Sequence, residues 1–296
     1  DNASTDGSAR RVHDAFPQVK LFPLRHNTGF ARGFNVGVSH APDGCDVVVA
    51  LNPDTVPRPD FLEHLVAPLD RDATIGSVAG TLAFASAPDR IASAGIAIHR
   101  NGVAIDARLG ERVFESDNTV DVFGASGGAA AFRLSAYQSA GGFFDPYFMY
   151  LEDVDLSWRL RLRGWRSVWS PAAVATHEYS LSAGEGSSFK RRLLARNRLW
   201  VLARCLPADV WSRDRRAILG FDLIVMAHAI ATRDAAVLRG RAEGLAAMPL
   251  RLHEGTRISA AASVSWMDLD RWVEPAIGPG ELLRMRRLTM RLARSV

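Results

Sequence analysis

The chain has 296 residues, of which 48% are hydrophobic and 23% charged, and its formal net charge is +4. This composition is typical of a globular protein. Its two cysteines, Cys45 and Cys205, are far apart in sequence, which disfavours a disulfide framework and favours a reducing compartment. We find no signal peptide and no uninterrupted apolar run of the roughly 20 residues that cross a bilayer. We therefore expect a cytoplasmic protein.

The first part of the chain predicts alternating strands and helices. The expected elements are a strand at 19–24, a helix at 31–40, a buried strand at 46–51, a helix at 60–69 with Asp60 as its N-cap, and a strand at 75–80. This alternation predicts a layered α/β fold with a largely parallel sheet. Residues 85–125 are rich in Gly, Ala and Ser and predict short antiparallel strands and loops.

Polar turns flank these predicted strands. Residues 1–8 precede the first strand, residues 27–35 follow it, and Asn52-Pro53-Asp54 follows the second. A surface turn explains each one equally well. Because ligands of open α/β sheets bind outside the carboxyl ends of strands, three such turns in succession favour a polar, anionic ligand.

Three acids, Glu152, Asp153 and Asp155, follow the aromatic run 147–150 and begin a predicted amphipathic helix. Acids in an apolar setting are costly unless they bind a ligand or do chemistry. An ion pair with Arg159 explains Asp155 but leaves the other two acids unexplained, so we predict a function for Asp153. The helix is expected to bury Leu156, Leu160 and Leu162 and to expose Arg159, Arg161 and Arg163.

His177 ends a further predicted strand at 173–177. With Asp54 it would offer nitrogen and oxygen ligands that suit Mg²⁺ or Mn²⁺ holding a diphosphate. The small residues at 124–131 fit a segment near a bound sugar and, equally, a tightly packed strand.

The end of the chain predicts helices at 189–206, 213–232 and 234–248. We therefore divide the chain into a domain at 1–185 and a helical extension at 186–296. Arginines crowd residues 190–216 and 281–296. They suit an anionic membrane surface or a phosphate-rich partner, and a solvated helix face explains them as well. No nucleic-acid-binding motif is found, so no nucleic acid is expected.

The order of these motifs resembles that of the family 2 glycosyltransferases of GT-A fold, especially the bacterial branch of rhamnosyltransferases and galactofuranosyltransferases. The motifs are Asp1–Ser8, Asn27–Phe30, Asn52–Asp54, Gly141–Asp155 and His177, and the resemblance covers roughly residues 1–200. It implies a Rossmann-like, mostly parallel central sheet flanked by helices. It also implies metal-dependent, inverting transfer of a rhamnose- or galactofuranose-type sugar. The donor would be a nucleotide-diphosphate sugar, and the acceptor a cell-envelope glycan or a polyprenyl-linked glycan at the inner face of a bacterial membrane.

The resemblance also implies roles for individual residues. Asp153 corresponds to the catalytic base, and Asp54 and His177 correspond to metal ligands. Asn52 stands where the family's metal-binding element has its first acid, and it can hydrogen-bond ribose or ligate a metal weakly through its carbonyl oxygen. The expected nucleotide- and substrate-binding residues are Asp1, Asn27, Gly29, Arg32, Asn52 and Glu152.

One departure and one alternative remain. Family members carry a strand and a helix before the motif at which this chain begins, so we expect that first strand to be missing and the chain to be destabilised and poorly active. The alternative function is a non-catalytic, membrane-associated nucleotide-sugar-binding protein. An oxidoreductase is disfavoured because no G-x-G-x-x-G follows a strand. Oligomeric state, nucleotide and linkage are left open.

Overall fold

The computed structural model describes residues 1–178 and 186–293. For Trp266, within the second range, it describes the backbone but not the side chain. The predicted domain boundary at 185 and the last three residues of the basic tail lie outside these ranges. Among the described residues, no helix is both long enough and apolar enough to cross a membrane.

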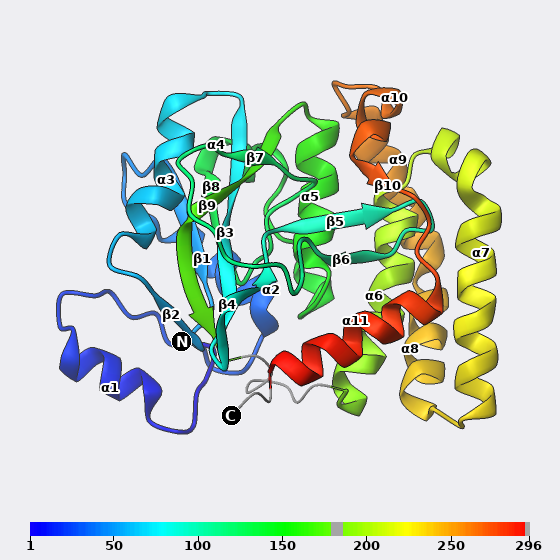
Figure 1. The fold of residues 1–296 in the computed structure, drawn as a ribbon, viewed down its shortest axis with the longest axis horizontal. Coiled ribbons are helices and arrows are strands. Elements are labelled where there is room, and N and C mark those ends of the chain that lie inside the picture. Colours follow the sequence, from blue (N-terminus) through cyan, green and yellow to red (C-terminus); the bar gives the residue numbers. More distant parts are fainter. Residues whose placement is uncertain (179–185, 294–296) are drawn as a thin grey trace.

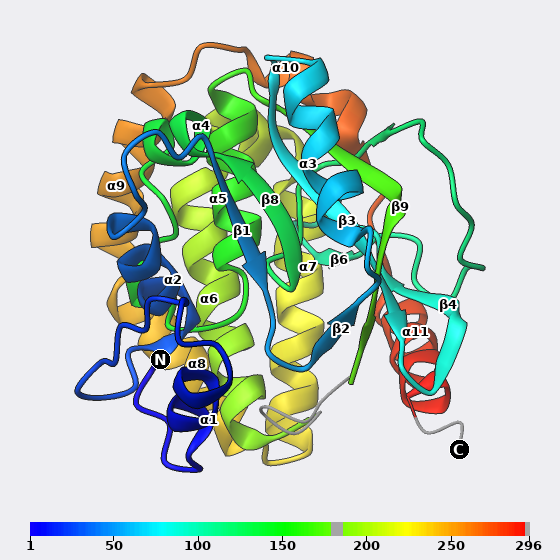
Figure 2. The ribbon, with the colours of Figure 1, turned by 90° about the vertical axis from the view of Figure 1, so that its left-hand side faces the viewer.

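A mixed sheet lies at the centre of the molecule (Figure 1). Its strands follow the order β1 (Val47–Leu51), β8 (Ala129–Arg133), β3 (Ile75–Phe84), β9 (Arg166–His177) and β2 (Thr55–Pro57). Two short strands extend it: β4 (Ala87–Ser93) pairs with β3, and β7 (Val120–Asp121) pairs with β9. Figure 2 views this sheet with the C-terminal helices behind it.

The expected α/β fold is confirmed, but the expected largely parallel pairing is wrong. Among the described strands of this sheet, β3 and β9 pair in parallel, and the other pairs are antiparallel. Strands β1 and β3 do run in the same direction, as the strand–helix–strand alternation predicts. Strand β8, from the small-residue segment, inserts between them in the opposite direction and pairs with both.

Two apolar layers cover the two faces of the sheet. Helix α3 (Phe61–Arg71) packs on one face through Phe61, Leu65 and Leu69. Helices α2 (Gly29–Ser39), α4 (Leu134–Ser139) and α5 (Glu152–Leu162) form the layer on the other face. Successive residues of β8 alternate between the two layers, as the two-residue period of a strand requires. Asp60 is at the N-cap of α3, as predicted, but its side chain makes no capping hydrogen bond.

The predicted strand at 19–24 is wrong. The segment pairs with the first residue of the chain, through hydrogen bonds from the Asp1 amino group to Phe22 O and from Leu24 N to Asp1 O. Pro23 has no N–H to donate to a ladder. The exposed helix α1 (Ser8–Ala15) precedes this segment.

Residues 85–125 form short strands, as predicted. Strands β5 (Ile96–His99) and β6 (Ala104–Asp106) pair antiparallel, and β10 (Val273–Glu274), from near the end of the chain, pairs in parallel with β5. This small sheet therefore joins the C-terminal part of the chain to the first part.

The three predicted C-terminal helices are confirmed as α6 (Ser188–Cys205), α7 (Ala208–Ala231) and α8 (Ala235–Ala246). The remaining elements are α9 (Met248–Ala260), α10 (Trp266–Leu269), α11 (Pro279–Leu292) and the 3-10 turns Asp145–Tyr147 and Asp270–Trp272. Helix α6 packs against α5, α8 and α9. The close packing of α8 on α6 requires glycine at position 240, because a Cβ on Gly240 would lie 2.2 Å from Arg192 O.

Candidate active site

A cavity of about 510 Å³ lies at the carboxyl ends of β1 and β9. Its walls come from segments that are far apart in sequence: the turn after β1, the last residue of β9, the glycine-rich loop before β8, and the first turns of α5 and α6. The polar turn after β1 and the histidine that ends β9 therefore meet at one edge of the sheet.

Asp54 and His177 face each other across this edge. Their Oδ1 and Nε2 atoms are 3.2 Å apart, and their side chains are 12% and 14% exposed. Strand β2 brings them together, because Thr55 pairs directly with His177. Asp54 Oδ1 is buried and accepts no hydrogen bond from the residues that the structure describes. Such an atom is costly unless a ligand satisfies it.

These two side chains fit a divalent cation in part. A carboxylate oxygen and an imidazole nitrogen are ligands that such ions accept. Within residues 1–178 and 186–293, no cluster of three or more His, Cys, Asp or Glu side chains is arranged to hold a metal. A cation at this position would therefore take its other ligands from a bound diphosphate and from water.

Asp153 lies in the first turn of α5 and lines the same cavity. Its Oδ2 accepts a hydrogen bond from Gly127 N (3.0 Å), and its Oδ1 accepts one from Val154 N (2.8 Å). Burial raises the pKa of Asp153, and the hydrogen bond from Gly127 opposes this shift. The carboxylate is therefore fixed in position and is a better proton acceptor than an ordinary aspartate.

Glu152 also lines the cavity and is 6% exposed. Its Oε2 is buried without a hydrogen-bond partner in the described part of the chain. Burial, and secondly the charge of Asp153, raise the pKa of Glu152 well above its ordinary value. Of the two adjacent acids, Glu152 therefore holds a proton the more strongly.

The turn that leads into α5 is strained. Phe148, Tyr150 and Leu151 all have positive φ angles, of 67°, 70° and 68°, which residues other than glycine rarely adopt. Asn197 of α6 holds this turn: its Nδ2 donates to the carbonyl groups of Tyr147 (3.2 Å), Met149 (2.9 Å) and Tyr150 (2.7 Å). Strain of this kind persists only where the surroundings enforce it.

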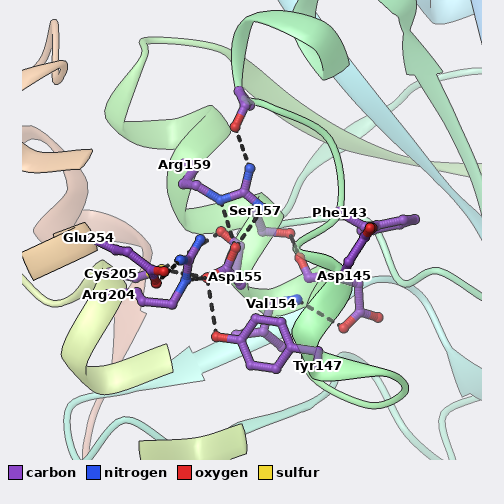
Figure 3. Close-up of polar contacts among 12 residues, drawn as sticks. Phe143, Asp145, Tyr147, Val154, Asp155, Ser157, Arg159, Arg204, Cys205 and Glu254 are labelled. Carbon is purple, nitrogen blue, oxygen red and sulfur yellow. Dashed lines mark hydrogen bonds and ion pairs between the residues drawn. The ribbon is translucent and has the colours of Figure 1, made fainter. Parts of the chain in front are cut away.

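Asp155 lies in the next part of α5 but does not line the cavity. It lies in a buried polar cluster (Figure 3). The expected ion pair with Arg159 is confirmed, with Nε 2.6 Å from Oδ1, and Arg204 adds a second at 2.8 Å from Oδ2. The Tyr147 hydroxyl and the Cys205 thiol also donate to Oδ2. Burial alone would raise the pKa of Asp155, but the two guanidinium groups lower it to about 2.

The prediction that Arg159 and Arg161 lie outside is wrong, since both are buried. Arg159 is held by Asp155. Arg161 donates from Nε to Phe123 O (3.0 Å) and stacks on Trp272, with its guanidinium carbon 4.2 Å from the ring centroid. The expected burial of Leu156, Leu160 and Leu162 and the exposure of Arg163 are confirmed.

The predicted nucleotide-binding residues divide into two groups. Asn27 and Asn52 line the cavity, whereas Asp1, Gly29 and Arg32 do not. The side chain of Asp1 instead accepts a hydrogen bond from Ser4 N. Gly29 has a φ of +83°, and a Cβ there would lie 2.3 Å from Phe148 O, so the position requires glycine for packing. Arg32 is exposed on α2.

Sequence reasoning missed several cavity residues. Asn2 lines the cavity and also holds the turn at 27–29, because its Oδ1 accepts from Thr28 N (2.8 Å) and its Nδ2 donates to Gly29 O (2.9 Å). Lys190 enters from the first turn of α6, and its Nζ is 5.4 Å from the centroid of the Tyr150 ring. Asp106 enters from the end of β6. Asn2 belongs to the Asp1–Ser8 motif, which assigned it no role, and no motif in the sequence marks Lys190 or Asp106.

Residues 1–140 of the chain match the family model described as glycosyl transferase family 2. The N-acetylglucosaminyl-diphospho-decaprenol L-rhamnosyltransferase of Mycobacterium tuberculosis is 31% identical over 207 residues, which cover 62% of this chain and 66% of the relative. Glucomannan 4-beta-mannosyltransferase 7 of Arabidopsis thaliana is 30% identical over 152 residues, covering 49% of this chain and 25% of the relative. The chain thus spans about two thirds or less of the length of these relatives.

The fold is similar to that of a solved structure, GalNAc-T7 with UDP, GalNAc and Mn²⁺. The TM-score is 0.56 and the sequence identity 14%, and the match covers 90% of this chain and 49% of the other. At this identity, the likeness concerns the fold alone.

Proposed function

Because this chain belongs to glycosyltransferase family 2 and has the GT-A fold, we propose that it is an inverting glycosyltransferase. It would move a sugar from a nucleotide-diphosphate donor to a hydroxyl of a lipid-linked glycan acceptor. One observation carries the proposal: the backbone-held Asp153, whose pKa is raised, and the buried Asp54–His177 pair line a single cavity. A fixed carboxylate with a raised pKa is suited to accept a proton from a hydroxyl group.

The relative's name supports the identity of the substrates. It is a rhamnosyltransferase that acts on an N-acetylglucosaminyl-diphospho-decaprenol. We propose a rhamnose-type donor sugar, with galactofuranose as the second candidate, and a polyprenyl-linked acceptor of the bacterial cell envelope. Such an acceptor would place the enzyme at the inner face of the cell membrane, with peripheral contact through its basic C-terminal helices.

The donor diphosphate would bind at the Asp54 side of the cavity. Asp54 and His177 would hold Mg²⁺ or Mn²⁺, and the buried Oδ1 of Asp54 would then gain a partner. When bound, the cation would neutralise negative charge on the departing diphosphate. Asn27 and Asn52, which line the same cavity, would hydrogen-bond the nucleotide.

Asp153 would act as the general base. Its ionised carboxylate would accept the proton of the acceptor hydroxyl while that oxygen forms a bond to the anomeric carbon of the sugar. The bond from the anomeric carbon to the diphosphate oxygen breaks on the opposite face, and the electron pair leaves with the nucleotide diphosphate. A single displacement of this kind inverts the anomeric configuration.

Glu152 would bind the acceptor. A protonated carboxyl group beside the base can donate a hydrogen bond to a sugar oxygen, which a carboxylate cannot do. We propose that residues 1–185 bind the donor and that residues 186–296 guide the acceptor towards the cavity, with Lys190 at the junction.

The test is an Asp153→Asn substitution. Turnover of the nucleotide-diphosphate sugar should fall about 10²- to 10⁴-fold, while the thermal shift caused by donor with Mn²⁺ is kept. Asp14→Asn, which changes an exposed acid of α1, is the matched control and should leave both unchanged. Turnover within threefold of that of the unsubstituted chain would refute the role of Asp153.

A further inference from the structure

We infer that the outer face of α7, together with a basic groove at its C-terminal end, is a docking surface for an anionic phospholipid bilayer. The inference rests on the proposed function, because it gives the enzyme a way to reach a lipid-linked acceptor. It concerns a surface outside the cavity described above.

The outer face of α7 is apolar and exposed. Leu219, Leu223, Ile224 and Ile230 are 49%, 70%, 53% and 62% exposed. Leu219, Leu223 and Ile230 lie four and seven residues apart, so they share one side of the helix. Helix α7 lies at the edge of the molecule farthest from the central sheet (Figure 1). Contiguous apolar surface of this kind marks an interaction site.

Charge is absent from this face over about three turns. Between Leu219 and Ala231 the sequence contains one acid and no Lys or Arg. That acid, Asp222, points inward: its Oδ1 accepts hydrogen bonds from Arg198 Nε (2.9 Å) and Arg241 Nη2 (2.6 Å). His228 is the other titratable residue of the stretch, and it lies in the groove.

The groove at the C-terminal end of α7 is basic. Its volume is about 800 Å³, and its walls come from α6, α8, α11 and the turn after α7. Its cationic residues are Arg191, Arg192, Arg233, Arg239 and Arg286. Three of them are paired with acids: Arg191 with Asp234, and Arg192 and Arg239 with Glu243.

Arg233 and Arg286 have no acidic partner in the part of the chain that the structure describes. The groove therefore keeps a net positive charge that phosphate groups can neutralise. Arg215 and Arg216 are exposed near the other end of the apolar face. An apolar helix face bordered by arginines is the pattern of a helix that lies in a membrane interface.

A bilayer fits this surface better than a second copy of the chain. In a two-fold dimer, each copy would present the same patch to the other, and the uncompensated arginines of both would be brought together. An anionic bilayer instead offers acyl chains to the leucines and phosphates to the arginines. Helix α11 contributes Arg286 but little apolar surface, because Met285, Leu288 and Leu292 are partly buried against the protein.

The groove and the cavity share one turn of α6. Lys190 lines the cavity, and the next two residues, Arg191 and Arg192, line the groove. Lipid headgroups bound in the groove would therefore lie at the first turn of α6, which is also a wall of the cavity. A lipid-linked acceptor requires this proximity.

The test is co-sedimentation of the full chain with vesicles of phosphatidylcholine, with and without phosphatidylglycerol. The unsubstituted chain should bind the anionic vesicles, and high salt should weaken binding. Leu223→Glu should lower the partition coefficient about tenfold or more. Arg233→Ala and Arg286→Ala should each lower it about fivefold on anionic vesicles alone. Leu62→Glu, at an exposed leucine of α3, is the matched control and should have no effect.

Two outcomes would overturn the docking surface. One is equal binding by the Leu223→Glu and Leu62→Glu variants. The other is a dimer in solution that Leu223→Glu converts to monomers without any change in vesicle binding. Donor turnover measured without vesicles separates this inference from the proposed function. Lost vesicle binding with normal turnover supports the docking surface, whereas absent turnover in a chain that still binds vesicles refutes the enzyme activity alone.

Discussion

Asp153 and Asp155 are two residues apart in α5, yet their surroundings differ in kind. Asp153 lines a cavity, is held by two backbone N–H groups, and has a raised pKa. Asp155 is fully buried between Arg159 and Arg204, and its pKa is lowered to about 2. An acid whose charge is balanced by neighbouring arginines stabilises the fold. An acid that lacks such cationic partners is available to a substrate.

The largest effect should come from breaking the compensated cluster. Asp155→Asn keeps the size of the side chain but removes the charge that balances two buried guanidinium groups. The free energy of unfolding should fall by about 3–5 kcal/mol, the usual cost of leaving a buried charge unpaired. Denaturant unfolding followed by circular dichroism measures this change.

The same change at the cavity acid is the control. Asp153→Asn should change the unfolding free energy much less, because the loss of an unfavourably buried charge offsets the loss of one of the two backbone hydrogen bonds. If both variants lost stability equally, the distinction between the two acids would be wrong.

A smaller difference is expected between alanine substitutions at two glycines, Gly124 on the buried side of α5 and Gly127 at the cavity wall. A Cβ on Gly124 would meet Ser157 Oγ at 1.9 Å on the buried side of α5, whereas one on Gly127 would lie 3.1 Å from the Phe30 ring at the cavity wall. Gly124→Ala should therefore cost about 1–3 kcal/mol of stability through overpacking. Gly127→Ala should change stability little and lower donor turnover several-fold.

Thermal unfolding and turnover of both glycine variants make this comparison. A Gly127→Ala variant with unchanged turnover would show that the loop does not border the bound substrate. A stable Gly124→Ala variant would show that Ser157 moves aside without cost.

The parts of the fold that the sequence predicted are those set by local periodicity. The continuous apolar run at 46–51 gave β1, the strand–helix alternation gave the first part of β3, and the helical patterns gave α2, α3 and α6. The position of β8 between β1 and β3 was missed because strand order depends on long-range pairing, which has no local signal. The burial of Arg159 and Arg161 was missed because charge predicts exposure unless the partners are known.

The parts of the site that lie at the ends of strands could be predicted from the sequence. Asp54 and His177 each follow or end a strand, and strand ends meet at one edge. Lys190 and Asp106 depend on how α6 and the small sheet pack against that edge, and sequence spacing does not reveal it. The strained turn before α5 was hidden for the same reason, since the residue that holds it, Asn197, lies in a distant helix.

The smallest effect should come from Glu152→Gln. Gln can still donate a hydrogen bond to an acceptor hydroxyl, so turnover should fall less than tenfold, while Glu152→Ala should lose more because it has no donor. A KM for acceptor that rises in Glu152→Ala and is rescued in Glu152→Gln would support the proposed contact. Equal turnover by the two variants would contradict it.

Glu152 and Asp155 should also make the unfolding free energy depend on pH with slopes of opposite sign. Burial raises the pKa of Glu152, so above the unfolded value of about 4.3 the folded chain binds more protons than the unfolded chain. The unfolding free energy contributed by this group therefore falls as pH rises from about 4 towards the folded pKa.

Asp155 has a folded pKa of about 2, so its contribution is complete above the unfolded value of about 3.9 and is lost as pH falls towards 2. Unfolding free energies measured across this pH range should show both slopes in the unsubstituted chain. Glu152→Gln should lessen only the slope above pH about 4, to which Asp153 also contributes because its pKa is raised. Asp155→Asn should lessen only the slope below it. A Glu152→Gln variant whose upper slope was as steep as that of the unsubstituted chain would show that Glu152 has no raised pKa, and would remove the support for its donating a hydrogen bond to the acceptor.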